Sequence, residues 1–246
     1  MLLLPVIASA ALATENGGMR NDADAQIRWA SMPVSFVIDG ANDEDLDEGS
    51  VVYSVVSAAS AWNRVDGAGV DLDFGGSATG DEDAEMGDVV SFTSDWTDSP
   101  ELLAVTRVWS MTDGTAIGFQ MLVNEADHDW SLDGAMETVD LQNALTHEFG
   151  HALGLGHLDD ADATMYGTAL TGEVSKRDLS EADEDAILGL YEGGGDLSSE
   201  PTKVEDDAFP WASFGCSSAP GVPVVPGVGI ALALVLRRSR EFPCSR

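Results

Sequence analysis

The segment His147–His157 reads HEFGHALGLGH, and it decides how the rest of the chain is interpreted. His147 and His151 are four residues apart, so an α-helix places both imidazoles on one face, one turn apart, where they can bind one metal ion. Glu148 projects beside that metal, where a general base for its water is needed. Gly154 can adopt a positive φ and end the helix, which lets His157 turn back as a third ligand. Three nitrogen ligands leave a fourth zinc position open for water, as in catalytic sites.

All five fixed positions match the pattern HExxHxxGxxH, and in this the chain resembles the metzincin metalloproteases. The chain has 4 histidines, and three of them occupy these positions, so we favour a metal site over a core helix with chance histidines. Further along, Met165-Tyr166 resembles the Met-turn beneath the metal and the tyrosine that follows it in metzincins. A core methionine is the alternative for Met165 taken alone.

The composition favours a globular domain and argues against a nucleic-acid-binding protein. The chain has 246 residues, which suffice for one substantial domain with tails, and 44% are hydrophobic. The net charge of -33 argues against a nucleic-acid partner. Cys216 and Cys244 both lie near the C-terminus, so the body of the chain has no internal disulfide.

The N-terminal segment Met1–Ala13 reads MLLLPVIASAALA, an apolar run ending in small residues. It resembles the end of a secretory signal peptide, although no Lys or Arg precedes the apolar run. A buried N-terminal strand is the alternative. Residues 14–26 form a short polar segment, and export to the extracellular space or the bacterial cell surface is expected.

Hydrophobic periodicity predicts five strands and three helices before residue 192. Ser180 and Asp183 have the spacing of a capping box for the last helix, and Asp140 can cap the helix that carries the histidines. Gly193–Gly195 stops the last helix. The strands are expected at residues 34–38, 70–74, 88–92, 102–110 and 117–124, and the helices at 46–64, from 141 to beyond 151, and 181–191.

This order of elements resembles the catalytic domain of the matrixins, the peptidase family of the matrix metalloproteases and their bacterial relatives, over residues 27–191. The resemblance implies an α+β fold: a twisted, mostly parallel five-stranded sheet with an antiparallel edge strand, and three helices. We expect the edge strand at Ile117–Asn124. Leu158 departs from the Ser of many matrixins, and a lone His128 cannot form the second zinc site of the vertebrate enzymes. We also expect no folded pro-domain between Ala13 and Ile27, and no cysteine to cap the zinc.

The loop of residues 75–87 is rich in glycine and acidic residues. Its carboxylates offer oxygen ligands for Ca²⁺. A surface loop without calcium is the alternative, and we favour it. The four candidate ligands are Asp81, Glu82, Asp83 and Glu85.

Residues 192–215 read as a linker, and residues 216–246 as a tail. The tail has Cys216, a short apolar run at Val228–Leu236 and an arginine cluster after it. It resembles a C-terminal sorting signal of the myxobacterial type, which implies processing near Cys216 and retention at the cell surface. A weak tail anchor is the alternative.

The metzincin resemblance implies a zinc endopeptidase, with one catalytic Zn²⁺ on His147, His151 and His157, and Glu148 as general base. Tyr166 is expected to stabilise the oxyanion. A protein or peptide substrate is expected to lie extended along the edge strand, with its S1′ pocket between Ala144 and the segment after Met165. The chain is expected to be a monomer. The alternative is a catalytically silent zinc-binding surface module.

Overall fold

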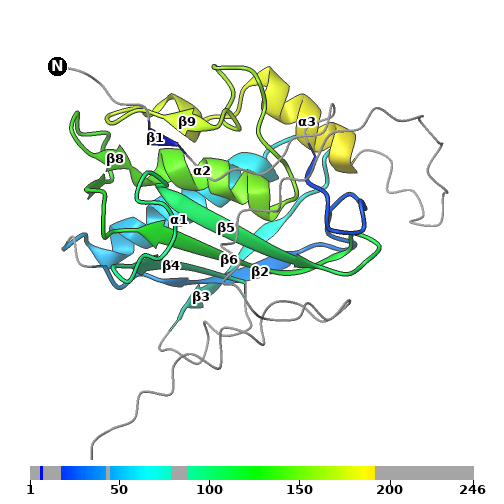
Figure 1. Cartoon of the computed structure of the whole chain (residues 1–246), viewed down its shortest axis with the longest axis horizontal. Coiled ribbons are helices and arrows are strands. Elements are labelled where there is room, and N and C mark those ends of the chain that lie inside the picture. The colour runs from blue at the N-terminus through cyan, green and yellow to red at the C-terminus, as the bar shows by residue number, and fades with distance from the viewer. Residues whose placement is uncertain (1–5, 8–17, 43–44, 79–87, 192–246) are drawn as a thin grey trace, which may run out of the picture.

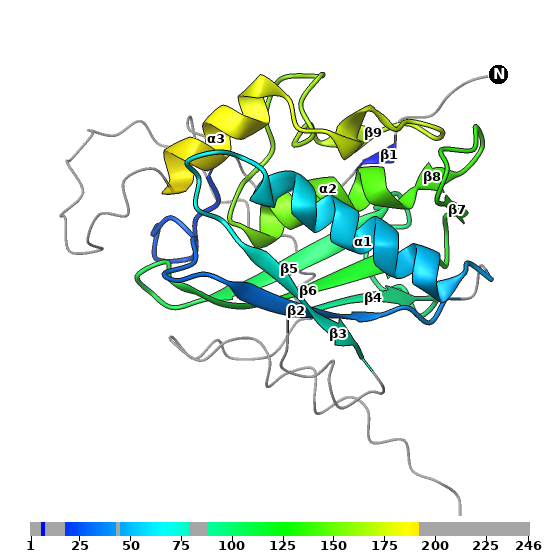
Figure 2. The ribbon, with the colours of Figure 1, turned by 180° about the vertical axis from the view of Figure 1, so that it is seen from behind.

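The fold is built on one five-stranded sheet, with the two long helices on the same face of it (Figures 1 and 2). The computed structural model describes residues 6–7, 18–42, 45–78 and 88–191. The strand order is β3-β2-β4-β6-β5. β2 is parallel to β3 and β4, β4 is parallel to β6, and β5 is antiparallel to β6. The expected fold class is therefore confirmed. The strands are β2 Val34–Asp39, β3 Leu72–Ser77, β4 Val89–Thr93, β5 Ala104–Ser110 and β6 Ala116–Asn124.

The expected position of the antiparallel edge strand was wrong. Ile117–Asn124 belongs to β6, which lies between β4 and β5, and the antiparallel strand at the edge of the sheet is β5. The two strands form one hairpin and have similar apolar content, so their order within the sheet cannot be read from periodicity. Pairing decides it: β6 alone continues the parallel ladder from β4, with Val90 opposite Met121.

Three helices complete the fold: α1 Glu48–Asn63, α2 Leu141–Ala152 and α3 Glu181–Tyr191. Side chains cap each of them at the N-terminus. Asp47 accepts a hydrogen bond from the Ser50 amide, and Asp140 accepts one from the Asn143 amide. At α3 the predicted capping box is present, because the Ser180 hydroxyl and the Asp183 carboxylate each bind the other's amide.

Several short elements were not predicted, because two or three residues carry no periodicity. The segment η1 is a single 3₁₀ turn between α2 and α3, and β1 pairs antiparallel with β9. These elements are β1 Val6–Ile7, β7 Trp130–Ser131, β8 Val139–Asp140, β9 Thr168–Ala169 and η1 Ser175–Arg177.

The core fills the space between the sheet and helices α1 and α2. Phe149 of α2 packs on Phe36 of β2, with ring centroids 5.1 Å apart, and on Phe119 of β6 at 6.3 Å. Helix α1 contacts α2 as well: the indole of Trp62 in α1 donates a hydrogen bond to the Thr146 carbonyl at 2.8 Å. Because Phe149 and Thr146 lie on the histidine-bearing helix, the core fixes α2 against both the sheet and α1.

Helix α2 ends through a glycine, as expected. Gly154 has a φ of +100°, and its Cα lies so close to the Ile27 carbonyl that a Cβ would be 2.2 Å from that oxygen. The Leu155 amide then donates back to the Gly150 carbonyl at 2.9 Å. Both the positive φ and the close approach require glycine at this turn.

Several expected segments lie outside the described residues. They are the acidic stretch 81–85, Gly193–Gly195, the linker and tail 192–246, and most of the signal peptide. Of the signal peptide, the structure describes Val6–Ile7. The helices of the described residues include none with the length and apolar character of a membrane span.

Gly150 is predicted to be intolerant of a side chain. In the Gly150→Ala variant, the new Cβ would lie 2.2 Å from the Met165 sulfur and 2.8 Å from the Trp62 ring. We expect the free energy of unfolding to fall by about 1–3 kcal/mol, a typical result of overpacking a core. Urea unfolding would measure it.

The matched control for this helical glycine is Gly189→Ala in α3, where an added Cβ meets nothing within 4 Å. Since alanine is the better helix former, this variant is expected to be more stable than the wild type by up to about 1 kcal/mol. Equal losses of stability in both variants would contradict the packing described for Gly150.

Candidate functional site

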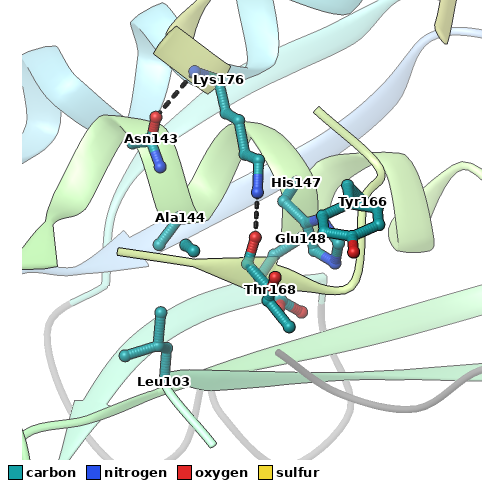
Figure 3. Close-up of a pocket in the computed structure, with 9 residues that line it drawn as sticks. Leu103, Asn143, Ala144, His147, Glu148, Tyr166, Thr168 and Lys176 are labelled. Carbon is teal, nitrogen blue, oxygen red and sulfur yellow. Dashed lines mark hydrogen bonds between the residues drawn. The ribbon is translucent and has the colours of Figure 1, made fainter. Parts of the chain in front are cut away.

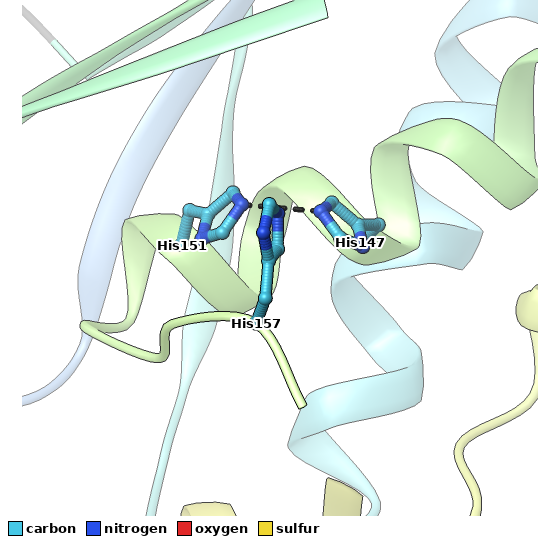
Figure 4. Close-up of side chains that lie close together, drawn as sticks. All are labelled: His147, His151 and His157. Atoms are coloured by element: carbon cyan, nitrogen blue, oxygen red, sulfur yellow. Dashed lines mark hydrogen bonds between the residues drawn. The ribbon is translucent and has the colours of Figure 1, made fainter. Parts of the chain in front are cut away.

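Three histidines converge beside the end of α2 (Figure 4). His147 and His151 project from consecutive turns of the helix, and His157 approaches from the segment that follows Gly154. Their candidate ligand atoms all lie within 4.8 Å of one another. His128 is not a member of this cluster. The geometry is that of a group that can hold one metal ion.

Hydrogen bonds to backbone carbonyls define the tautomers of the two helical histidines. The Nδ1 atom of His147 lies 2.7 Å from the Thr164 carbonyl oxygen, and that of His151 lies 2.8 Å from the Leu155 carbonyl oxygen. A carbonyl only accepts, so each Nδ1 carries the proton and donates it. Each neutral ring then has a lone pair on Nε2, and these two atoms face each other at 3.1 Å. Two lone pairs at this distance repel unless a cation lies near both.

His157 completes the set of donors. Its Nε2 is buried and has no hydrogen-bond partner among the described residues. Burial lowers the pKa of His147 well below its usual value, that of His151 to about 4 and that of His157 to about 3. All three rings are therefore neutral near pH 7. Three neutral imidazole nitrogens with converging lone pairs fit a divalent metal such as zinc.

Glu148 lies next to the histidines and is 1% exposed. Its Oε2 accepts a hydrogen bond of 2.6 Å from the hydroxyl of Thr106 on β5. Burial raises the pKa of Glu148 to about 7, and the bond from Thr106 opposes that rise. The carboxyl group is thus held in one orientation and exchanges its proton near neutral pH.

Met165 is fully buried, its sulfur lies against Gly150 of the histidine-bearing helix, and its backbone is fixed from α3. The buried Asp183 carboxylate accepts hydrogen bonds from the Thr164 amide at 2.7 Å and the Met165 amide at 2.9 Å. Since the Thr164 carbonyl in turn accepts from His147, the capping residue of α3 indirectly orients that ring.

A pocket opens beside His147 and Glu148 (Figure 3). Ala144 of α2 and residues of the segment after Met165 both line it. Tyr166 lies in its wall. The residues that line it are Leu103, Asn143, Ala144, His147, Glu148, Tyr166, Thr168, Ala169 and Lys176.

Two residues of the site were missed by sequence reasoning, and a third was only partly understood. Thr106 and Lys176 carry no local signal, because a threonine in a strand and a lysine in a loop are ordinary residues at a surface. Asp183 was found as a helix cap, but its bonds to the Thr164 and Met165 amides depend on tertiary structure.

Comparisons with known proteins agree with this arrangement. A family model described as matrixin, peptidase M10, matches residues 28–192. Matrix metalloproteinase-27 of Homo sapiens is 38% identical over 88 residues, which are 36% of this chain and 16% of that protein. Matrilysin of Homo sapiens is 36% identical over 86 residues, 35% of this chain and 32% of that protein. Metalloendoproteinase 2-MMP of Arabidopsis thaliana is 38% identical over 74 residues, 27% of this chain and 19% of that protein. The chain thus spans less than a third of the length of each of these relatives.

Asp183→Asn is predicted to loosen the histidine site from a distance. The amide group keeps the shape of the carboxylate but presents N–H groups to the backbone donors of Thr164 and Met165, so at least one buried donor loses its acceptor. We expect a loss of about 1–3 kcal/mol in the free energy of unfolding. Because His147 loses its fixed orientation, we also expect about 10-fold weaker zinc binding. Urea unfolding and competition with a zinc-binding dye measure the two effects.

Asp185→Asn is the control for this variant, since Asp185 lies on the same helix and is exposed. It should leave both quantities unchanged. If the two variants bind zinc with equal affinity, the orientation of His147 does not depend on Asp183.

Proposed function

Because the chain belongs to the matrixin family of peptidases, we propose that it is a zinc-dependent endopeptidase that hydrolyses peptide bonds within protein or peptide substrates. The observation that carries the proposal is the convergence of three unprotonated histidine nitrogens beside a buried glutamate and a pocket. A structural zinc site would need no such glutamate and would use a fourth protein ligand.

In this proposal His147, His151 and His157 hold the zinc ion through Nε2. Their Nδ1 bonds keep two of the rings in the required tautomer. When bound, zinc acts as a Lewis acid and makes water nucleophilic near neutral pH.

Glu148 is proposed as the general base. Its carboxylate takes a proton from water as the water oxygen bonds to the carbonyl carbon of the substrate, and then gives that proton to the amine nitrogen as the C–N bond breaks. A pKa of about 7 suits both transfers, because the group must accept and release one proton at the same pH. Tyr166, whose side chain lines the same pocket, is proposed to donate a hydrogen bond to the negatively charged oxygen that develops on the carbonyl.

We propose β5, in place of the strand first expected, as the edge along which the substrate lies. One side of β5 pairs with β6, and within the described sheet its other side has no strand partner. Thr106 of β5 touches Glu148, so a peptide added to this edge would pass beside the site. The substrate residue that follows the cleaved bond is called P1′. Its side chain would then enter the pocket between Ala144 and Ala169.

Export, attachment to the cell surface through residues 216–246 and a monomeric state are further parts of the proposal. Export and attachment are supported by the sequence features of the two ends: the apolar run before Ala13, and the Cys216 segment with the apolar run and arginines after it. The monomeric state stays a prediction. For the acidic stretch at 81–85, a surface loop without calcium stays the favoured prediction, and calcium binding stays its alternative.

Glu148→Gln separates metal binding from catalysis. The amide cannot accept the proton of the attacking water, so we expect kcat to fall by a factor of about 10²–10⁴ while one zinc per chain remains bound. Zinc content is measured by atomic absorption, and cleavage by mass spectrometry on a mixed peptide library with and without 1,10-phenanthroline. Glu181→Gln, at an exposed position of α3, is the control and should behave as the wild type. A wild type that binds zinc but cleaves nothing would favour the silent binding module.

Thr106→Val removes the hydroxyl that holds the Glu148 carboxylate but keeps the shape of the side chain. We expect kcat to fall about 10-fold with unchanged zinc content, as for other groups that orient residues of a metal site. Thr106→Ser restores a hydroxyl and should recover most of the loss. Equal kcat values for the Val and Ser variants would exclude this role of Thr106.

A further inference from the structure

A buried lysine forms part of the pocket wall (Figure 3). Lys176 belongs to η1, and only 3% of its side chain is exposed. Its backbone amide donates to the Asn143 side chain of α2 at 2.8 Å, which anchors the residue against the histidine-bearing helix. The side chain runs from there toward β9, and its ammonium lies among the pocket residues. A lysine this buried in a cleft needs an explanation, because lysine is rarely buried without full pairing.

The ammonium has fewer partners than it has donors. It donates to the Thr168 carbonyl, and its nitrogen lies 5.5 Å from the centre of the Tyr166 ring. Glu173 is an ion-pair partner at 3.8 Å, beyond hydrogen-bond distance. The Glu173 oxygens already accept from the Leu170 amide and the Ser175 hydroxyl. Among the described residues, the three N–H groups of Lys176 thus make one hydrogen bond to protein.

The neighbouring cation, Arg177, is paired with a carboxylate at hydrogen-bond distance, in contrast to Lys176. Arg177 forms a two-bond pair with Asp140 and also donates to the Leu132 carbonyl at 2.9 Å. It therefore serves the N-terminus of α2. Of the two basic residues of η1, Lys176 alone lines the pocket and has donors left for a ligand.

The other residues of the pocket wall are the reason why the Lys176 ammonium would discriminate between P1′ side chains. Leu103, Ala144 and Ala169 contribute apolar surface to the same pocket wall. A large apolar P1′ side chain would cover the ammonium without offering an acceptor, which is unfavourable for a desolvated charge. Burial already lowers the pKa of Lys176, so its charge is poorly solvated before a substrate arrives. A side chain that ends in an acceptor would supply the missing hydrogen bond.

We propose that Lys176 makes this pocket select substrates whose P1′ side chain ends in a hydrogen-bond acceptor, namely the carboxylate of glutamate or the carboxamide of glutamine. The proposal rests on the endopeptidase function proposed above and names its substrate class. Attraction to Lys176 favours the carboxylate of glutamate at P1′, whereas the nearby Glu148 and Glu173 disfavour a further negative charge in the pocket. Peptides with glutamate and with glutamine at P1′ are therefore both tested.

The experiment compares peptides that differ only at P1′, with Glu, Gln, Leu or Ala, on the zinc-loaded full chain. We expect the Glu or the Gln peptide to exceed the Leu peptide at least about 10-fold in kcat/KM, which corresponds to 1.4 kcal/mol. In Lys176→Met, which keeps the length of the side chain without the charge, this order should reverse in favour of Leu. Arg64→Met removes an equal charge at an exposed position of the molecule and should keep the wild-type order.

Two results would overturn the proposal. The first is a wild-type enzyme that prefers Leu at P1′. The second is an active Lys176→Met enzyme that ranks the four peptides in the same order as the wild type. Failure of the endopeptidase function is separable, because zinc-loaded Glu148→Gln protein can bind the same peptides without turnover. Fluorescence anisotropy on that protein should rank Glu or Gln above Leu, and the opposite ranking refutes the selectivity even where nothing is cleaved.

Discussion

The site depends on one buried carboxylate. Asp183 accepts hydrogen bonds from the amides of Thr164 and Met165. It thereby fixes a turn whose carbonyl orients His147 and whose methionine packs against Gly150 of α2. Without it, the chain after His157 would have no fixed contact with α3 at this turn, and two buried amides would lack acceptors. The same carboxylate caps α3 through Ser180, so the helix and the turn form together. The Asp183 carboxylate thus accepts backbone amides on both sides, that of Ser180 in its own helix cap and those of Thr164 and Met165 in the turn.

Burial has opposite electrostatic effects on the two kinds of group in the site, and both favour the proposed chemistry. Desolvation disfavours the charged form, so it lowers the pKa of each histidine and raises that of Glu148 to about 7. Neutral histidines are the form that binds a metal, and a carboxyl group near its pKa can both take and return a proton. One physical cause, desolvation by burial, thus prepares all four side chains.

The sequence predicted those features that depend on local spacing. The helical face of His147 and His151, the turn at Gly154, the cap of α2 and the capping box of α3 follow from periodicity and from side chains within a few residues of each other. What it could not predict depends on contacts between distant segments. The order of β5 and β6 follows from pairing with β4, and Thr106 meets Glu148 only because β5 is at the edge beside α2. Lys176 reaches the pocket because Asn143, 33 residues earlier, holds its backbone.

The segment from Tyr166 to Arg177 connects catalysis with selectivity through separate contacts. Its first part, with Tyr166, follows the turn held by Asp183, whereas η1 is attached to α2 through Asn143 and through the pair of Arg177 with Asp140. Between these anchors, Leu170 and Val174 are exposed, and the Gly172 amide donates to the Thr138 carbonyl at 2.8 Å. Asn143 holds the backbone of Lys176, whereas among the described residues its ammonium donates one hydrogen bond, to the Thr168 carbonyl, so it has donors left for a substrate.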